Sequence, residues 1–197
     1  MLGLGTGTLS CYRTPGQTWT FFEIDPVVVQ IARGSDYFHY MAECAGNSEI
    51  ILGDGRLSLH KVSNEQFDLL LMDAFASDSV PVHLITQEAL DLYMAKLAPD
   101  GLVAFNISNN YMNFIPVLAK LAESRGFSIR VNKYRTPESL WFSSYKFGSD
   151  WIVMSRTPEA LQFLDGKTGW QPVNAATNQR LWTDDYSNII GVLKWLQ

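Results

Sequence analysis

Apolar runs of strand character alternate with runs of helical spacing along most of the chain. The run from Phe67 to Asp73 is almost unbroken, as in a strand buried on both faces. Strands that alternate with helices favour an α/β fold, in which a mostly parallel sheet carries helices on both faces. The predicted strands are residues 18–24, 49–52, 67–73, 102–108, 127–134 and 151–155.

Capping and terminating residues set the expected helices. Gly34 and Gly126 are placed to end two of them, and Thr86 is placed to cap a third. Pro99-Asp100-Gly101 predicts a turn before the next strand. The predicted helices are residues 26–33, 86–97, 113–124 and 187–196.

Two stretches show no clear period. Gly166 to Arg180 is weakly structured, and Arg135 to Asp150 predicts a long β-connection or a surface flap. Aromatic side chains in the second stretch either cover a cationic substrate or form an ordinary core or interface patch. They are Trp141, Phe142, Tyr145 and Phe147.

Composition excludes several classes of protein. The 197 residues fit one domain, and 47% hydrophobic with 18% charged residues is wrong for a disordered chain. A formal charge of −5 argues against a nucleic-acid binder, which needs a basic face. No apolar run reaches the roughly 18 residues of a membrane span, and no signal peptide is visible.

The two cysteines, Cys11 and Cys44, are too few for a disulfide framework. They favour a reducing compartment, so we expect a cytoplasmic protein. We expect both side chains to be buried as small apolar groups.

Glycines and acids follow four consecutive predicted strands. In open α/β sheets, ligands bind beyond the carboxyl ends of the strands. The four strand ends are Gly3-Leu4-Gly5-Thr6-Gly7, Glu23-Ile24-Asp25, Gly53-Asp54-Gly55 and the run from Asp73 to Asp78.

The residue types at these ends suit a nucleoside. The glycine run lets the backbone approach a ligand, but it is not the dinucleotide fingerprint, because Thr8 stands where that pattern needs glycine. Glu23 offers two oxygens to two ribose hydroxyls. Asp54 either accepts from an adenine amino group or forms a turn. Together they predict an S-adenosyl nucleoside site without a phosphate clamp.

The chain resembles the spermidine synthase (polyamine aminopropyltransferase) family of the class I S-adenosylmethionine-dependent methyltransferase superfamily. It is most similar to bacterial spermidine synthase-like domains fused to membrane transporter segments. The resemblance implies a Rossmann-like fold and covers nearly the whole chain. The matching stretches are residues 3–8, 22–26, 53–59, 73–84, 97–101 and 182–188.

The resemblance assigns roles to individual residues. It implies that Asp73 deprotonates the attacking amine, since an ammonium cannot attack the carbon beside a sulfonium. The donor is then S-adenosylmethionine or its decarboxylated form, and the product is S-adenosylhomocysteine or methylthioadenosine. The implied donor-binding residues are Gly3, Gly5, Thr6, Gly7, Glu23, Ile24, Asp25, Gly53, Asp54, Gly55, Asp73 and Ala74.

Two positions depart from the family pattern. Thr6 replaces an acid that anchors the aminopropyl amine, and Ala76 replaces an acid that holds the polyamine. Asp78 is the nearest substitute and is expected to act in catalysis and in substrate binding. Three later residues either hold an amine or belong to an acidic helix start: Asp184, Asp185 and Tyr186.

The histidines carry less information. His83 either assists proton transfer beside Asp73 and Asp78 or packs in its loop. His39 and His60 have no acids at ligand spacing, so no metal site is predicted.

Three functions remain open. The first is transfer of an aminopropyl group to a small-molecule amine with Asp73 as base. The second is S-adenosylmethionine-dependent methyl transfer to a small molecule. The third is a non-catalytic nucleoside-binding domain of a larger membrane protein. The family also implies a homodimer.

The first strand is expected to be truncated. Spermidine synthases have a small β-rich segment before the glycine loop, which this sequence does not match, and only Met1-Leu2 stand in the first strand's place. We expect either a piece of a longer protein, such as a membrane-fused one, or a minimal form.

Overall fold

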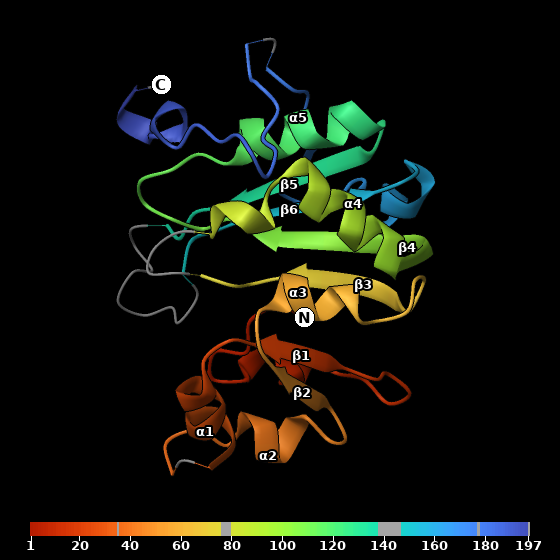
Figure 1. Ribbon diagram of the computed structural model, residues 1–197, viewed down its shortest axis with the longest axis vertical. Coiled ribbons are helices and arrows are strands. Elements are labelled where there is room, and N and C mark those ends of the chain that lie inside the picture. Colours follow the sequence, from red (N-terminus) through yellow and green to blue (C-terminus); the bar gives the residue numbers. More distant parts are fainter. Residues whose placement is uncertain (35, 76–79, 138–146, 177, 197) are drawn as a thin grey trace.

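A computed structural model describes residues 1–34, 36–75, 80–137, 147–176 and 178–196. One half of its sheet is parallel, with β1 beside β2 and β3 beside β4. These strands are β1 (Thr20–Glu23), β2 (Glu49–Leu52), β3 (Phe67–Met72) and β4 (Leu97–Asn106). Figure 1 shows β1, β3 and β4 pointing their carboxyl ends toward the same edge.

The two parallel pairs are joined through Leu2. Leu2 forms parallel bridges to Phe22 of β1 and to Met72 of β3. Its amide donates to the Leu71 carbonyl over 2.8 Å, and its carbonyl accepts from the Asp73 amide over 2.9 Å. The truncated first strand is therefore one bridging residue in this structure, and it makes the sheet continuous.

The other half of the sheet is antiparallel. β4 pairs with β6 (Ser149–Ser155), β6 with β5 (Ser128–Tyr134), and β5 with β7 (Trp170–Pro172). β5 and β6 are the two arms that the predicted connection or flap, residues 135–150, joins. Its residues Trp141, Phe142 and Tyr145 lie outside the described residues.

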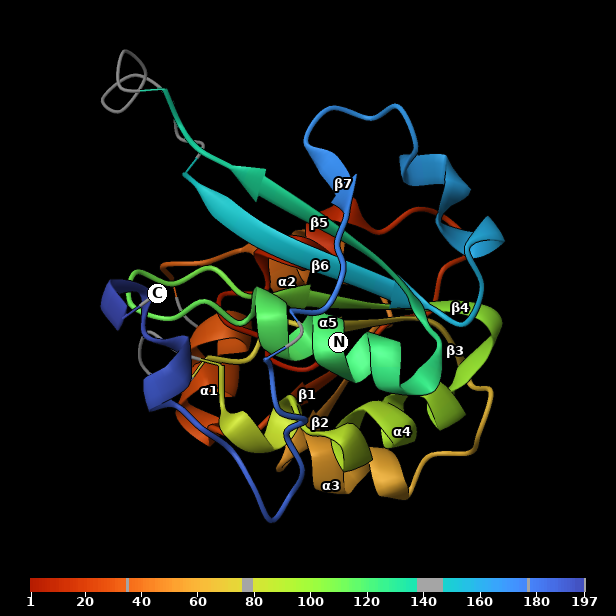
Figure 2. The same ribbon diagram turned by 90° about the horizontal axis from the view of Figure 1, so that it is seen from above.

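Helices cover both faces of the sheet, as predicted (Figures 1 and 2). Phe21 packs in a cluster with Ala32 and Met41, whereas its neighbour Phe22 packs in the main core, because successive strand residues face opposite sides. The helices on the first face are α1 (Pro26–Gly34) and α2 (Tyr40–Cys44). Those on the second are α3 (Gly55–His60), α4 (Gln87–Lys96) and α5 (Ile115–Arg125).

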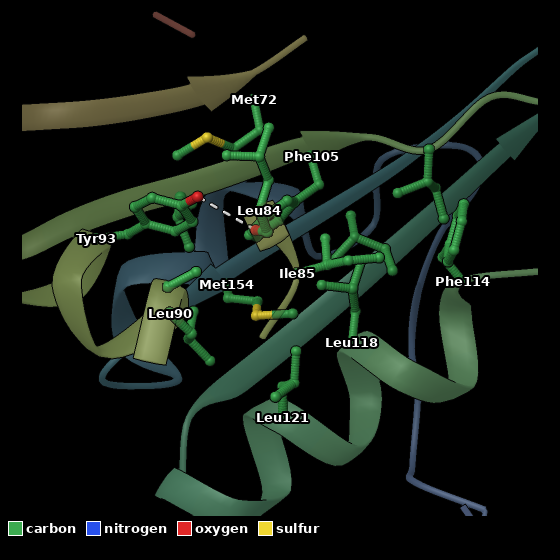
Figure 3. Close-up of a cluster of buried hydrophobic side chains, with 14 of the residues drawn as sticks. Met72, Leu84, Ile85, Leu90, Tyr93, Phe105, Phe114, Leu118, Leu121 and Met154 are labelled. Atoms are coloured by element: carbon green, nitrogen blue, oxygen red, sulfur yellow. Dashed lines mark hydrogen bonds between the residues drawn. The ribbon is translucent and has the colours of Figure 1, made fainter. Parts of the chain in front are cut away.

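The main core lies between the sheet and helices α4 and α5 (Figure 3). Tyr93 is fully buried there, and its hydroxyl donates to the Leu84 carbonyl over 3.2 Å. The caps are also as predicted. The Thr86 hydroxyl accepts from the Ala89 amide at the start of α4, and Gly126 ends α5 with a left-handed backbone at φ 67°.

The prediction that β3 is buried on both faces is wrong for its first half. Leu69 is 47% exposed, and Asp68 is exposed as well. Both line a cavity of about 440 Å³ that also contacts Met1 and the residues leading into β1. Met1 bonds to Thr20 at the start of β1 but leaves Leu69 uncovered, so this part of β3 meets solvent.

Two other local predictions are also wrong. The predicted turn at residues 99–101 lies inside β4, where the register shifts between the pairs Phe67–Leu97 and Leu69–Leu102. The predicted C-terminal helix is two short 3₁₀ turns, η5 (Ile190–Val192) and η6 (Lys194–Leu196). The Lys194 amide donates to the Tyr111 carbonyl, which takes this backbone away from helical bonding.

The prediction of two separate buried cysteines is wrong as well. Cys11 and Cys44 form a disulfide, with Cα atoms 4.7 Å apart, and Cys11 is exposed. The bond joins the 3₁₀ helix η1 (Thr8–Tyr12) to α2. Because disulfides persist in oxidising surroundings, the cysteines no longer argue for a reducing compartment.

No helix in the described part of the chain is long and apolar enough to cross a membrane.

Candidate active site

The glycine loop lies directly against the end of β3. A Cβ atom on Gly3 would stand 2.3 Å from the Asp73 carbonyl oxygen, and Gly3 has φ +92°. Glycine is therefore required there, both by space and by backbone conformation. Gly5 instead has open space beside it, because a Cβ atom there would meet nothing within 4 Å. The loop thus packs at its start and presents open backbone at Gly5, as a ligand cradle needs.

Glu23 holds this loop onto β1. It is 8% exposed, and its two carboxylate oxygens accept from the Leu4 amide and from the Asp25 amide, each over 2.9 Å. A carboxylate has about four acceptor positions, so two remain for hydroxyl donors. The predicted ribose-binding residue is therefore also a structural residue of the loop.

Asp54 caps α3. Its Oδ1 accepts from the Leu57 amide over 2.8 Å, so the side chain is a helix cap, and its Oδ2 lies 3.5 Å from His83 Nε2. The apolar side chains around it are unusually open, with Ile24 67% and Leu57 66% exposed. Exposed aliphatic groups next to a carboxylate suit the two faces and the amino edge of a purine.

Asp73 lies at the end of β3, between the glycine loop and β4. The Asn106 amide nitrogen donates to Asp73 Oδ1 over 2.8 Å. Burial raises the pKa of Asp73, and the hydrogen bond from Asn106 acts in the opposite direction. Among the described residues, Oδ2 has no hydrogen-bond partner. A partly buried carboxylate with a raised pKa and one open oxygen can accept a proton.

A chain of hydrogen bonds leads from Asp73 to the β5–β6 arms. The Asn106 oxygen accepts from the Ser108 hydroxyl over 2.6 Å, which fixes the amide orientation. The Ser108 hydroxyl in turn accepts from the Asp150 amide over 2.9 Å. The Asp150 carboxylate accepts from Arg135 over 2.5 and 3.0 Å.

The sequence analysis missed this chain of polar residues. Asn106 and Ser108 close the predicted strand 102–108, so their place at a strand end was available as a signal. They are neither glycine nor acid, which is why they were not singled out. A cavity of about 620 Å³ opens beside them, lined by Phe75, Asn106, Ser108, Arg135 and Asp150 among others.

His83 does not lie where the sequence suggested. Its Nε2 is 3.5 Å from Asp54 Oδ2, and among the described residues it makes no contact with Asp73. The prediction that His83 assists proton transfer at Asp73 therefore loses its support. The short turn η2 (Val82–Leu84) carries the side chain toward α3 instead.

Asp184 belongs to a clamp rather than to a free amine site. Arg56 donates to both of its oxygens over 2.7 Å, and the Thr86 hydroxyl donates as well. These hydrogen bonds, Arg56 first, lower the pKa of Asp184. The clamp ties the C-terminal segment to α3 and α4.

The structure gives fewer contacts for the other residues predicted at the site. The Arg180 guanidinium lies 3.7 Å from the Tyr186 ring centre, and Asp185 is exposed. Asp78 lies outside the described residues. Thr6 shares a 2.7 Å hydrogen bond with Thr8, and Asp25 accepts from the Val27 amide at the start of α1.

Sequence comparison identifies one related protein. The polyamine aminopropyltransferase of Vibrio vulnificus (strain CMCP6) is 31% identical over 111 residues, which is 54% of this chain and 36% of that protein. The match thus spans about a third of that relative's length. No protein-family model matches the chain.

Structure comparison settles the fold. A probable spermidine synthase from Corynebacterium glutamicum superposes with a TM-score of 0.65 at 19% identity, covering 94% of this chain and 71% of that one. The chain has a class I methyltransferase fold. A spermidine synthase in complex with the transition-state analogue AdoDATO superposes at 0.59 and 16% identity, covering 88% of this chain and 61% of that one.

The fold is shared by proteins other than the spermidine synthases. A SAM-dependent methyltransferase from Archaeoglobus fulgidus superposes with a TM-score of 0.53 at 14% identity, covering 79% of this chain and 84% of that one. These comparisons confirm the resemblance and the fold class predicted from the motifs. At these identities the structural matches establish the fold alone.

Proposed function

We propose that the chain is a transferase that moves an aminopropyl group from decarboxylated S-adenosylmethionine to a small amine. One observation carries the proposal. Asp73 follows β3 beside the glycine loop and keeps one carboxylate oxygen without a partner among the described residues, and its other oxygen accepts from Asn106, which lines a cavity of about 620 Å³. A donor on one side and an amine on the other would therefore meet at this carboxylate.

The donor nucleoside fits the residues on the glycine-loop side. Gly5 gives space for close backbone approach, and Glu23 retains acceptor positions for ribose hydroxyls. Ile24 and Leu57 offer exposed apolar surface to the adenine, with Asp54 Oδ2 at its amino edge. The polyamine aminopropyltransferase relative supports this assignment over half of the chain.

The reaction requires one proton transfer and one displacement. The Asp73 carboxylate takes a proton from the acceptor ammonium, and the freed nitrogen lone pair attacks the methylene carbon next to the sulfonium. A C–N bond forms, the C–S bond breaks, and its electron pair stays on sulfur. The products are methylthioadenosine and the aminopropylated amine. Orientation of the two substrates supplies much of the remaining rate.

Methyl transfer from S-adenosylmethionine is the second candidate. Thr6 favours it, because it stands where the spermidine synthases have an acid for the aminopropyl amine. The methyltransferase from Archaeoglobus fulgidus shows that the same fold serves such donors. The products would then be S-adenosylhomocysteine and a methylated acceptor.

The test uses Asp73→Asn with Asp68→Asn as its matched control. Both residues are on or next to β3, but Asp68 lines the cavity at the opposite end of the strand. Release of methylthioadenosine or S-adenosylhomocysteine is measured with each donor and a panel of small amines. We expect Asp73→Asn to lower kcat/KM by about 10²–10⁴-fold and Asp68→Asn to leave it unchanged.

Equal activity of Asp73→Asn and the parent chain would refute the base role. Absence of both nucleoside products with every amine would support the third possibility, a non-catalytic nucleoside-binding domain. The homodimer implied by the family stays a prediction, which sedimentation analysis would test.

A further inference from the structure

Two neighbouring cavities extend from the Asp73 end of the sheet. One has a volume of about 620 Å³ and the other about 220 Å³. They share Arg135, Asp150 and Lys194, so they form one groove between the β5–β6 arms and the loop that follows β4. The larger volume lies within the range of small-molecule sites, which runs from about 300 to 1,000 Å³.

The charged residues along this groove are mostly cations. Among the described residues that line it, Lys133, Arg135 and Lys194 are basic and Asp150 is the one acid. Asp150 is 7% exposed, and Arg135 donates to both of its oxygens. Asp150 is therefore not a free carboxylate for a ligand, and Lys133 and Lys194 are left as surplus positive charge.

Lys194 is held in place rather than extended into solvent. Its Nζ donates to the Asn109 carbonyl over 2.6 Å, and its backbone amide is bonded to Tyr111. An ammonium bonded once still has two donors for a ligand. The hydrogen-bond chain through Ser108 and Asn106 connects this basic end of the groove to Asp73.

These charges favour one class of acceptor over another. A diamine would place its second ammonium among like charges, which is unfavourable at short range. An amine that also carries an anionic group would place that group against the surplus charge of Lys133 and Lys194. Charge-assisted hydrogen bonds of this kind are stronger than neutral ones.

We propose that the acceptor is an amino-acid-like amine, whose carboxylate binds at Lys133 and Lys194 while its amine meets Asp73. This assignment rests on the proposed transferase function and names the substrate class of the same site. It differs from a polyamine acceptor, which would need carboxylates where the described groove has bases.

The matched probes are ornithine and putrescine, because ornithine is putrescine with one added carboxylate. We expect kcat/KM to be higher for ornithine, and Lys194→Gln to raise the KM for ornithine roughly five- to tenfold while leaving putrescine unchanged or improved. Lys167→Gln is the control variant, because Lys167 is an exposed base in the turn before β7. It should change neither value.

Calorimetry separates this proposal from the proposed function. If no amine is turned over, binding of ornithine and putrescine to the parent chain still reports the charge preference of the groove. Tighter binding of putrescine, or ornithine binding that Lys194→Gln does not change, would overturn the proposal. A second result would also overturn it. If Lys194→Gln, titrated without any acceptor, bound S-adenosylmethionine more weakly but bound the decarboxylated form equally well, the lysine would be binding the carboxylate of the donor.

Discussion

Removal of the Cys11–Cys44 disulfide is expected to destabilise the fold and loosen the donor side of the site. The bond joins η1, which begins directly after the glycine loop, to the end of α2. The same two elements also meet through the Ser10 hydroxyl, which donates to the Tyr40 carbonyl over 3.2 Å. The perturbation is the double variant Cys11→Ser with Cys44→Ser.

The magnitude follows from the length of chain that the bond closes. The cysteines are 33 residues apart, and the loop-entropy relation for a crosslink of that length gives up to about 3.7 kcal/mol at 25 °C. Whole domains are stable by roughly 5–15 kcal/mol. The loss should also lower Tm by about 7–15 °C for a chain of this size.

Urea unfolding with and without a thiol reductant is the assay. The reductant should lower the unfolding midpoint of the parent chain to that of the double variant and should leave the variant itself unchanged. Methylthioadenosine should bind the variant more weakly, because α2 supports the end of the glycine loop. A midpoint that reductant does not move, or a loss well under 1 kcal/mol, would refute the reasoning.

Two further predictions concern the glycine loop and the base. Gly3→Ala should lose at least about 2 kcal/mol of unfolding free energy in urea, because its Cβ would stand 2.3 Å from the Asp73 carbonyl oxygen and φ is +92°. Gly16→Ala is the control for backbone strain alone, because Gly16 has φ +89° and a Cβ there would meet nothing within 4 Å. Equal losses in the two variants would contradict the packing argument. Asn106→Leu removes the hydrogen bond that counteracts burial at Asp73, so the pKa of Asp73 should rise further. Because the base works ionised, the acidic limb of the kcat/KM profile should move to higher pH, and an unmoved limb would count against Asp73 as the base. The raised pKa of Asp73 also means that the folded chain binds this proton more tightly than the unfolded chain does. The free energy of unfolding that this proton contributes is therefore present at low pH and is lost as pH rises.

The sequence predicted which residues gather at the candidate donor side, because strand order and strand ends are local signals. The glycine loop, Glu23 and Asp73 each follow an apolar run, and parallel strands bring such ends to one edge. Asn106 follows a strand in the same way. As an amide it is indistinguishable from a turn residue until the fold places it beside Asp73.

The errors came from pairs that are distant in the sequence. Arg56 and Asp184 are 128 residues apart, and their ion pair depends on the path by which the chain returns to α3. The disulfide depends likewise on α2 passing beside η1. The prediction of a C-terminal helix was wrong for the same reason, because the hydrogen bond from the Lys194 amide to the Tyr111 carbonyl replaces a local helical bond.

Calorimetric titration of the chain with a nucleoside tests the central claim most directly. Methylthioadenosine, S-adenosylmethionine and its decarboxylated form are each titrated into the parent chain and into Glu23→Gln. We expect one-to-one binding, tightest for the decarboxylated donor, and weaker binding to Glu23→Gln. Absence of binding for all three nucleosides to a folded parent chain would contradict it.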